Sequence, residues 1–122
     1  MKNLLLATAT VATLQLSLAN DAEAAQIKKV NFTSNNQNLV GNLYLPDDYQ
    51  EETKLPGVVV TGAWTTVKEQ MPATYAEELA DRGYAVLAFD FRNWGESGGK
   101  ERQLENPANK TQDIIAAANY LT

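Results

Sequence analysis

Ser97 is the residue of this sequence whose surroundings best match those of a catalytic nucleophile. It lies in the segment 95–99, G-E-S-G-G, which fits the G-x-S-x-G pattern. A nucleophilic serine in this pattern occupies a sharp turn between a strand and a helix, whereas Ser97 comes seven residues after Asp90, where an apolar run ends. The sequence contains no histidine to take up the serine proton, and an unactivated serine is a poor nucleophile. We therefore expect Ser97 to be a turn residue in a glycine-rich loop, and we expect no catalytic residue in this chain.

A second candidate is the segment 61–64, T-G-A-W, which follows three consecutive valines. Adjacent valines predict a strand that is buried on both faces, and open α/β sheets place ligand chemistry at the carboxyl ends of such strands. Backbone N–H groups at this position could form an oxyanion hole, which requires donors but no particular side chain. A plain connection between strand and helix is the alternative, and the pattern alone leaves both open.

The charged residues near these segments have simpler interpretations. Asp90 and Arg92 flank the end of an apolar strand, where they could be catalytic by position, but such groups more often fix a loop by bonding to its backbone. We interpret Lys68-Glu69 as a solvated pair or as a loop-anchoring ion pair of modest energy. The sequence lacks histidine and cysteine, which are the commonest transition-metal ligands, and we expect neither a metal nor a cofactor.

The elements that must position these residues predict an α/β fold. Alternating apolar residues predict two antiparallel strands, over residues 27–33 and 39–45, with a tight turn at Asn35-Asn36. Residues 56–62 and 84–89 predict two buried strands, and the helix between them has Pro72 in its first turn and Gly83 just past its end. Strand, helix and strand make a right-handed βαβ unit. A further helix follows the cap signal at 106–107.

Each predicted helix has an apolar stripe that we expect to pack on the sheet. In the first helix, Met71, Tyr75 and Leu79 fall four residues apart, beside two alanines. The stripe of the second helix consists of Ile114, Ile115, Ala118 and Leu121. At best one helix covers each face, and parallel strands need both faces covered and both edges paired, so the predicted sheet is incomplete.

The first 24 residues have the pattern of an export signal. Lys2 gives a positive start, residues 4–19 are mostly apolar, and A-E-A at 22–24 fits a cleavage site. We therefore predict a signal peptide over 1–24, a single domain over 25–122, and a periplasmic or extracellular bacterial protein. An uncleaved anchor helix is the alternative, but the apolar part is short and diluted by threonine, so we expect no stable membrane span. The net charge of −5 and the lack of a basic stripe disfavour nucleic acid as a partner.

Several segments, taken in order, resemble those of the bacterial group related to dienelactone hydrolases, within the α/β-hydrolase superfamily. They are V-V-V at 58–60, V-K-E-Q at 67–70, Y-A-E-E-L-A-D-R-G-Y at 75–84, A-F-D at 88–90, G-E-S-G-G at 95–99 and R-Q-L-E-N-P at 102–107. The resemblance covers about residues 27–122 and implies the N-terminal part of an α/β-hydrolase sheet. It implies that the strand of Val58 lies between the strand of Tyr84 and a later strand. It also implies an oxyanion-hole loop with the backbone of Ala63 or Trp64 as donor. Thr61 stands where many members have a histidine, which leaves a backbone donor in place.

The resemblance implies a function that this chain carries only in part. We expect the N-terminal fragment of an exported serine hydrolase that acts on small ester, lactone or related acyl substrates. The nucleophile, aspartate and histidine are expected beyond residue 122, so the chain by itself should be inactive. Two alternatives stay open: a secreted non-enzymatic module that binds a partner through the edge of the Val58 strand, and a fragment of a peptidase of the same fold.

Overall fold

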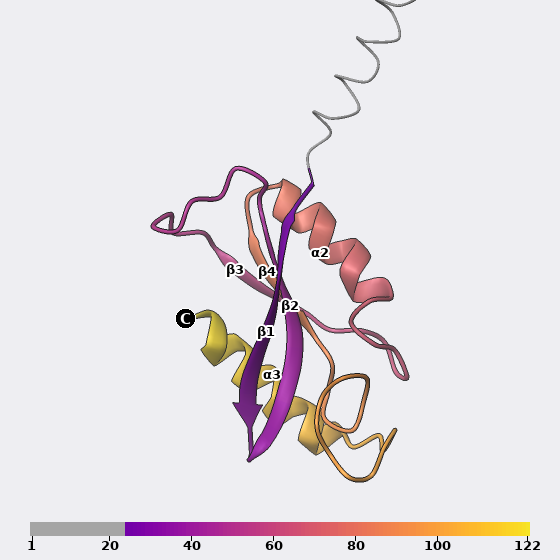
Figure 1. The fold of residues 1–122 in the computed structure, drawn as a ribbon. Coiled ribbons are helices and arrows are strands. Elements are labelled where there is room, and N and C mark those ends of the chain that lie inside the picture. The colour runs from indigo at the N-terminus through magenta and orange to yellow at the C-terminus, as the bar shows by residue number, and fades with distance from the viewer. Residues whose placement is uncertain (1–23) are drawn as a thin grey trace, which may run out of the picture.

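The computed structural model describes residues 24–122, so the predicted signal peptide, residues 1–24, lies outside the described residues except for its last position. The described chain contains four strands and two helices (Figure 1). Their bounds are Gln26–Ser34 (β1), Gln37–Leu45 (β2), Gly57–Val60 (β3), Met71–Asp81 (α2), Ala85–Phe89 (β4) and Pro107–Leu121 (α3).

The four strands of the described chain form one mixed sheet in the order β1-β2-β4-β3. Strands β1 and β2 make an antiparallel hairpin, in which Ser34 lies opposite Gln37. Between them, Asn35 and Asn36 have φ angles of 46° and 64°, which asparagine adopts more readily than most residues. Strand β4 is antiparallel to β2 and parallel to β3, and α2 connects β3 to β4. The predicted α/β fold class, with a hairpin, a parallel βαβ unit and a further helix, is confirmed.

One helix covers each face of the sheet. Successive residues of a strand point to opposite faces, so the residues of β4 pack alternately against the two helices. Along β4, Val86 and Ala88 belong to the apolar cluster beneath α2, whereas Leu87 and Phe89 belong to the cluster on the α3 side. Figure 1 shows the two helices on opposite sides of the sheet. These four residues of β4 are at most 2% exposed. Strand β4 is therefore the buried centre of the described sheet, and it fixes the place where the next segment, from Asp90, begins.

Helix α2 lies where the sequence predicts it, and the stripe expected to pack on the sheet is right for its two alanines but wrong for Met71 and Tyr75. Met71 and Tyr75 are 37% and 59% exposed. The buried face consists instead of Pro72, Ala76 and Ala80, which also fall four residues apart. Their small side chains let the helix axis approach the sheet more closely than a stripe containing tyrosine would allow.

Helix α3 shows the same kind of difference. It has the predicted cap, because the Asn106 side chain accepts a hydrogen bond from the Asn109 N–H at 3.2 Å. Its buried residues are Asp113 and Ala117, while Ile114 and Ile115 are exposed. Periodicity alone assigns an aspartate to the solvent side, but Asp113 has a buried partner, Arg92, and therefore takes an inward position.

Strand β3 lies at one end of the sheet, beside β4, as the resemblance implies. Among the described residues only β4 pairs with it. The further strand expected on its other side stays a prediction. Within residues 24–122, no helix is both long enough and apolar enough to span a lipid bilayer.

Candidate functional site

The parallel pairing of β3 and β4 brings two loops together at one edge of the sheet. Val60, the last residue of β3, pairs with Ala88, and β4 ends one residue later. The segments 61–70 and 90–106 therefore leave the sheet side by side, at the carboxyl ends of two parallel strands. This is the place where open α/β sheets bind ligands.

Lys68 joins the two loops. Its side chain is 1% exposed, and its Nζ lies 2.7 Å from Asp90 Oδ2, 2.7 Å from Glu69 Oε1 and 2.7 Å from Glu96 Oε1. Its backbone N–H also donates to Asp90 Oδ1 at 2.8 Å. Of the two interpretations of Lys68-Glu69, the solvated pair is wrong for Lys68, whereas the loop-anchoring ion pair agrees with these contacts. Neither hydrophobic pattern nor residue spacing signals this burial, because the partner Asp90 is distant along the chain.

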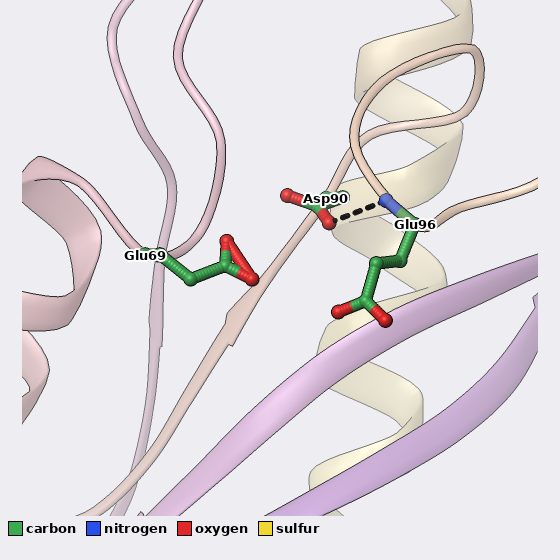
Figure 2. Close-up of side chains that lie close together, drawn as sticks. All are labelled: Glu69, Asp90 and Glu96. Atoms are coloured by element: carbon green, nitrogen blue, oxygen red, sulfur yellow. Dashed lines mark hydrogen bonds between the residues drawn. The ribbon is translucent and has the colours of Figure 1, made fainter.

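The carboxylates around Lys68 converge from both loops, as Figure 2 shows for Glu69, Asp90 and Glu96. One oxygen of each lies within 4.8 Å of the others, a spacing that could hold a cation through oxygen ligands. The Lys68 ammonium already contacts all three and supplies the compensating positive charge. We therefore describe this cluster as the setting of a buried lysine and assign no metal to it.

Asp90 is the centre of the cluster. Its side chain is 0% exposed, and Oδ2 also accepts a hydrogen bond from the Glu96 N–H at 2.9 Å. The chain can make this close return only because Gly95, with a φ of 51°, has no Cβ that would overlap the Asp90 carboxylate. The prediction that Asp90 fixes a loop is thus confirmed by its contacts.

The charges of the cluster support one another. Burial by itself lowers the pKa of Lys68, but hydrogen bonds to Asp90, Glu69 and Glu96 outweigh it, and the pKa ends above its ordinary value. Hydrogen bonds from Lys29 and Lys68 lower the pKa of Glu96 from 4.5 to about 2. Lys68 and Glu96 are therefore both charged at neutral pH.

Ser97 has a structural place in the same loop. Ser97 is 2% exposed. Its Oγ donates to the Asp90 carbonyl at 2.5 Å and accepts a hydrogen bond from the Val40 N–H at 2.9 Å. The hydroxyl thus ties the loop to β2 and does not face solvent. This geometry agrees with the interpretation of Ser97 as a loop residue.

The segment 61–66 contains exposed residues of the loop that follows β3. Ala63 and Trp64 are exposed, Trp64 by 72%. A turn holds them, because the Ala63 carbonyl accepts hydrogen bonds from the Thr66 N–H at 3.3 Å and from Thr66 Oγ1 at 2.7 Å. Within residues 24–122, neither the Ala63 N–H nor the Trp64 N–H donates a hydrogen bond. The loop therefore offers two backbone donors at the carboxyl end of β3.

A second buried ion pair lies close to the first. Arg92 Nη2 and Nε donate to Asp113 Oδ1 at 2.8 and 3.1 Å, and the Arg92 N–H donates to Asp113 Oδ2 at 3.0 Å. Arg92 also donates to three neutral groups, the side-chain oxygens of Ser34, Asn109 and Gln112. This pair anchors α3, and the Arg92 side chain bonds only to side-chain oxygens, so the predicted role of fixing a loop through its backbone is wrong for Arg92.

Comparison with known proteins finds sequence relatives, although no protein-family model matches the chain. The chain is 41% identical over 97 residues to the uncharacterized protein YcjY of Escherichia coli K12, covering 77% of this chain and 32% of that protein. It is 33% identical over 105 residues to the thiohydrolase aneE of Aspergillus aculeatus, covering 85% of this chain and 31% of that protein. The chain spans about a third of the length of these curated relatives.

The solved structures that resemble this chain are also about three times as long as the part it matches. The crystal structure of hypothetical protein PA2218 from Pseudomonas aeruginosa superposes with a TM-score of 0.74 at 37% identity, covering 80% of this chain and 30% of that one. The α/β hydrolase GrgF from Penicillium superposes with a TM-score of 0.68 at 19% identity, covering 78% of this chain and 32% of that one. Together with the strand order and the helix on each face, these likenesses show that the described residues form part of an α/β-hydrolase fold.

Proposed function

We propose that this chain supplies the first strands and the oxyanion-hole loop of a serine hydrolase that acts on ester, lactone or related acyl substrates. The observation that carries the proposal is that the N–H groups of two exposed residues, Ala63 and Trp64, have no partner among the described residues. The α/β-hydrolase fold and the likeness to a thiohydrolase support the same class of reaction.

The proposed role of the loop is electrostatic. Attack on an acyl carbon moves an electron pair onto the carbonyl oxygen, and donors at about 2.7–3.1 Å stabilise the resulting oxyanion. Backbone N–H groups do this best when they are held in place before the reaction, because no free energy is then spent on reorienting them. In this chain the turn at Thr66 and the buried Lys68–Asp90 pair hold the segment on the side that leads to α2.

Ser97 is not the nucleophile in this proposal, since its hydroxyl is buried between Asp90 and Val40. The nucleophilic serine, an aspartate and a histidine would belong to the portion of the relatives' length that this chain does not cover. The 122 residues alone should show no turnover, because they contain no histidine to act as the base of such a triad.

The narrower assignment rests on sequence segments. We propose membership in the bacterial group related to dienelactone hydrolases and export directed by residues 1–24. N-terminal sequencing of the protein recovered from the periplasm or the culture medium tests the export. A start at Ala25 is expected, whereas an intact Met1 in the cytoplasmic fraction would contradict it.

A fluorophosphonate probe, which reacts with activated serines, tests the proposed function. It is applied to the 122-residue chain and to the protein purified from cells that express its own gene. We expect the purified protein to carry the label on a serine outside these 122 residues and the chain to remain unlabelled. Labelling of Ser97 that disappears in a Ser97→Ala variant would overturn the assignment. A protein with neither label nor ester turnover would favour a non-enzymatic module instead.

A further inference from the structure

We propose that Lys68 is a positioning residue: through its contacts with Asp90 and Glu96 it sets the place of the loop that carries the Ala63 and Trp64 N–H groups. The effect on the loop depends only on the contacts described above. Its effect on a reaction rests on the proposed function.

Lys68 is fixed at both ends of its side chain. Its backbone N–H and its Nζ donate to the two oxygens of the same carboxylate, at 2.8 and 2.7 Å. Asp90 directly follows β4, the most buried strand of the described sheet. The Lys68 backbone is therefore anchored to the end of a sheet strand and not to another loop.

Lys68 is close along the chain to the two candidate donors, the N–H groups of Ala63 and Trp64. The Ala63–Thr66 turn is followed by a second turn, in which the Gln70 N–H donates to the Val67 carbonyl at 3.1 Å and the Val67 N–H donates to Gln70 Oε1 at 2.9 Å. Lys68 lies inside this second turn. A displacement of Lys68 is therefore transmitted through short, internally bonded turns to Ala63 and Trp64.

Glu96 forms the solvent-exposed side of the cluster. Glu96 contacts Lys68 and, on its other oxygen, Lys29 of β1. The loop of β3 is thus linked through Glu96 to the opposite edge of the sheet. Glu96 is about half exposed, so this arm can be changed without burying an unpaired charge.

Amide signals of the 15N-labelled 122-residue chain test the positioning directly. The Lys68→Met/Asp90→Asn double variant removes both buried charges together, which avoids leaving one of them unpaired. We expect shifted amide signals for residues 63–67 and at least a tenfold faster hydrogen exchange of the residue 68 amide. The Asp113→Asn variant, which weakens the other buried pair, is the matched control and should leave signals 63–67 in place. Unchanged signals in the double variant would overturn the proposal.

Chemical rescue separates positioning from general loss of structure. The sequence has no cysteine, so Lys68→Cys introduces the sole thiol, and aminoethylation of the unfolded variant followed by refolding restores an ammonium on a chain of nearly the same length. We expect the signals of Ala63 and Trp64 to return to their original positions after aminoethylation. A refolded, aminoethylated chain whose loop signals stay shifted would contradict the proposal.

Kinetics of the enzyme expressed from its own gene separate this inference from the proposed function. Glu96→Gln should lower kcat for an activated ester with little change in KM, because a displaced oxyanion donor acts only in the transition state. A displacement of about 1 Å can lower a rate by roughly a hundredfold. If the amide signals of residues 63–67 shift in the double variant but the enzyme shows no esterase activity, the positioning role of Lys68 is supported and the proposed function is contradicted. Esterase activity with unmoved amides and unchanged kcat would remove the positioning alone.

Discussion

Two buried ion pairs start two residues apart, at Asp90 and Arg92, and they serve different parts of the molecule. Asp90 binds Lys68 and holds a loop in which residues 63–65 are exposed. Arg92 binds Asp113 and holds helix α3 against the sheet. The same short segment after β4 therefore fixes the candidate site in one direction and the core packing in the other.

The partners of the two cations differ in a way that affects stability. Lys68 contacts three carboxylates, so its loss would leave like charges facing one another. Arg92 contacts one carboxylate and three neutral side-chain oxygens, so it keeps acceptors when Asp113 changes. The Lys68–Asp90 pair is therefore more easily disrupted than the Arg92–Asp113 pair.

The largest expected effect is that of Lys68→Met. This change leaves the fully buried Asp90 carboxylate without its counter-charge, and breaking a buried pair in this way costs about 3–5 kcal/mol. Urea denaturation, followed by circular dichroism, measures the loss in the free energy of unfolding. A loss of unfolding free energy below about 1 kcal/mol would mean that Lys68 does not hold the segments 61–70 and 90–106 together.

Asp113→Asn should have a smaller effect. The asparagine oxygen can still accept one hydrogen bond from Arg92, and a hydrogen bond to a charged group contributes about 1.5–3 kcal/mol. The same denaturation experiment checks the order of the two variants. An Asp113→Asn loss equal to or larger than that of Lys68→Met would contradict the proposed asymmetry between the two pairs.

Ser97→Ala should come third, at about 1–2 kcal/mol, because it leaves the buried Val40 N–H without an acceptor. If Ser97 is a loop residue, hydrolysis by the enzyme expressed from its own gene should be unchanged when rates are compared per folded molecule. A Ser97→Thr control keeps the hydroxyl. Complete loss of hydrolysis in a folded Ser97→Ala variant is the outcome that this account forbids.

The smallest effect is expected at acidic pH. The ionised form of Glu96 is favoured in the folded state, where hydrogen bonds from Lys29 and Lys68 lower its pKa to about 2. Its stabilising contribution is therefore complete above its ordinary pKa of 4.5 and is lost as the pH falls from there towards 2. Carbon-13 NMR of the Glu96 carboxyl measures the midpoint, which Lys29→Gln should raise. A midpoint near 4.5 in the unmodified chain would show that the Lys29 and Lys68 contacts do not persist in solution.

The sequence was sufficient to predict the elements that depend on local patterns. Consecutive valines indicated β3, the asparagine pair indicated the hairpin turn, and Asn106 indicated the cap of α3. It also located the segment around Ala63 at the end of a strand, although β3 is only half-buried and not buried on both faces as the valines predict, because it lies at the end of the described sheet. These features involve neighbours in the chain, which is why periodicity and turn chemistry identify them.

The sequence was not sufficient where the partner is distant. Lys68 finds Asp90 only after the parallel pairing of β3 and β4 has been formed, so the pattern could not decide between a solvated pair and a loop-anchoring one. Asp113 is buried for the same reason, since Arg92 lies 21 residues away. In α2, a stripe with Tyr75 and a stripe with Ala76 have the same period, and only the closeness of the sheet selects the smaller side chains.

The central claim is that the backbone at Ala63 and Trp64 binds the oxyanion of an acyl-transfer reaction. The most direct measurement is a crystal structure of the protein expressed from its own gene, after reaction with a phosphonate ester that mimics the tetrahedral intermediate. We predict the phosphonyl oxygen at about 2.7–3.1 Å from the nitrogen of Ala63 or Trp64. An adduct whose oxygen is bound by other donors, or a protein that forms no adduct, would contradict the account.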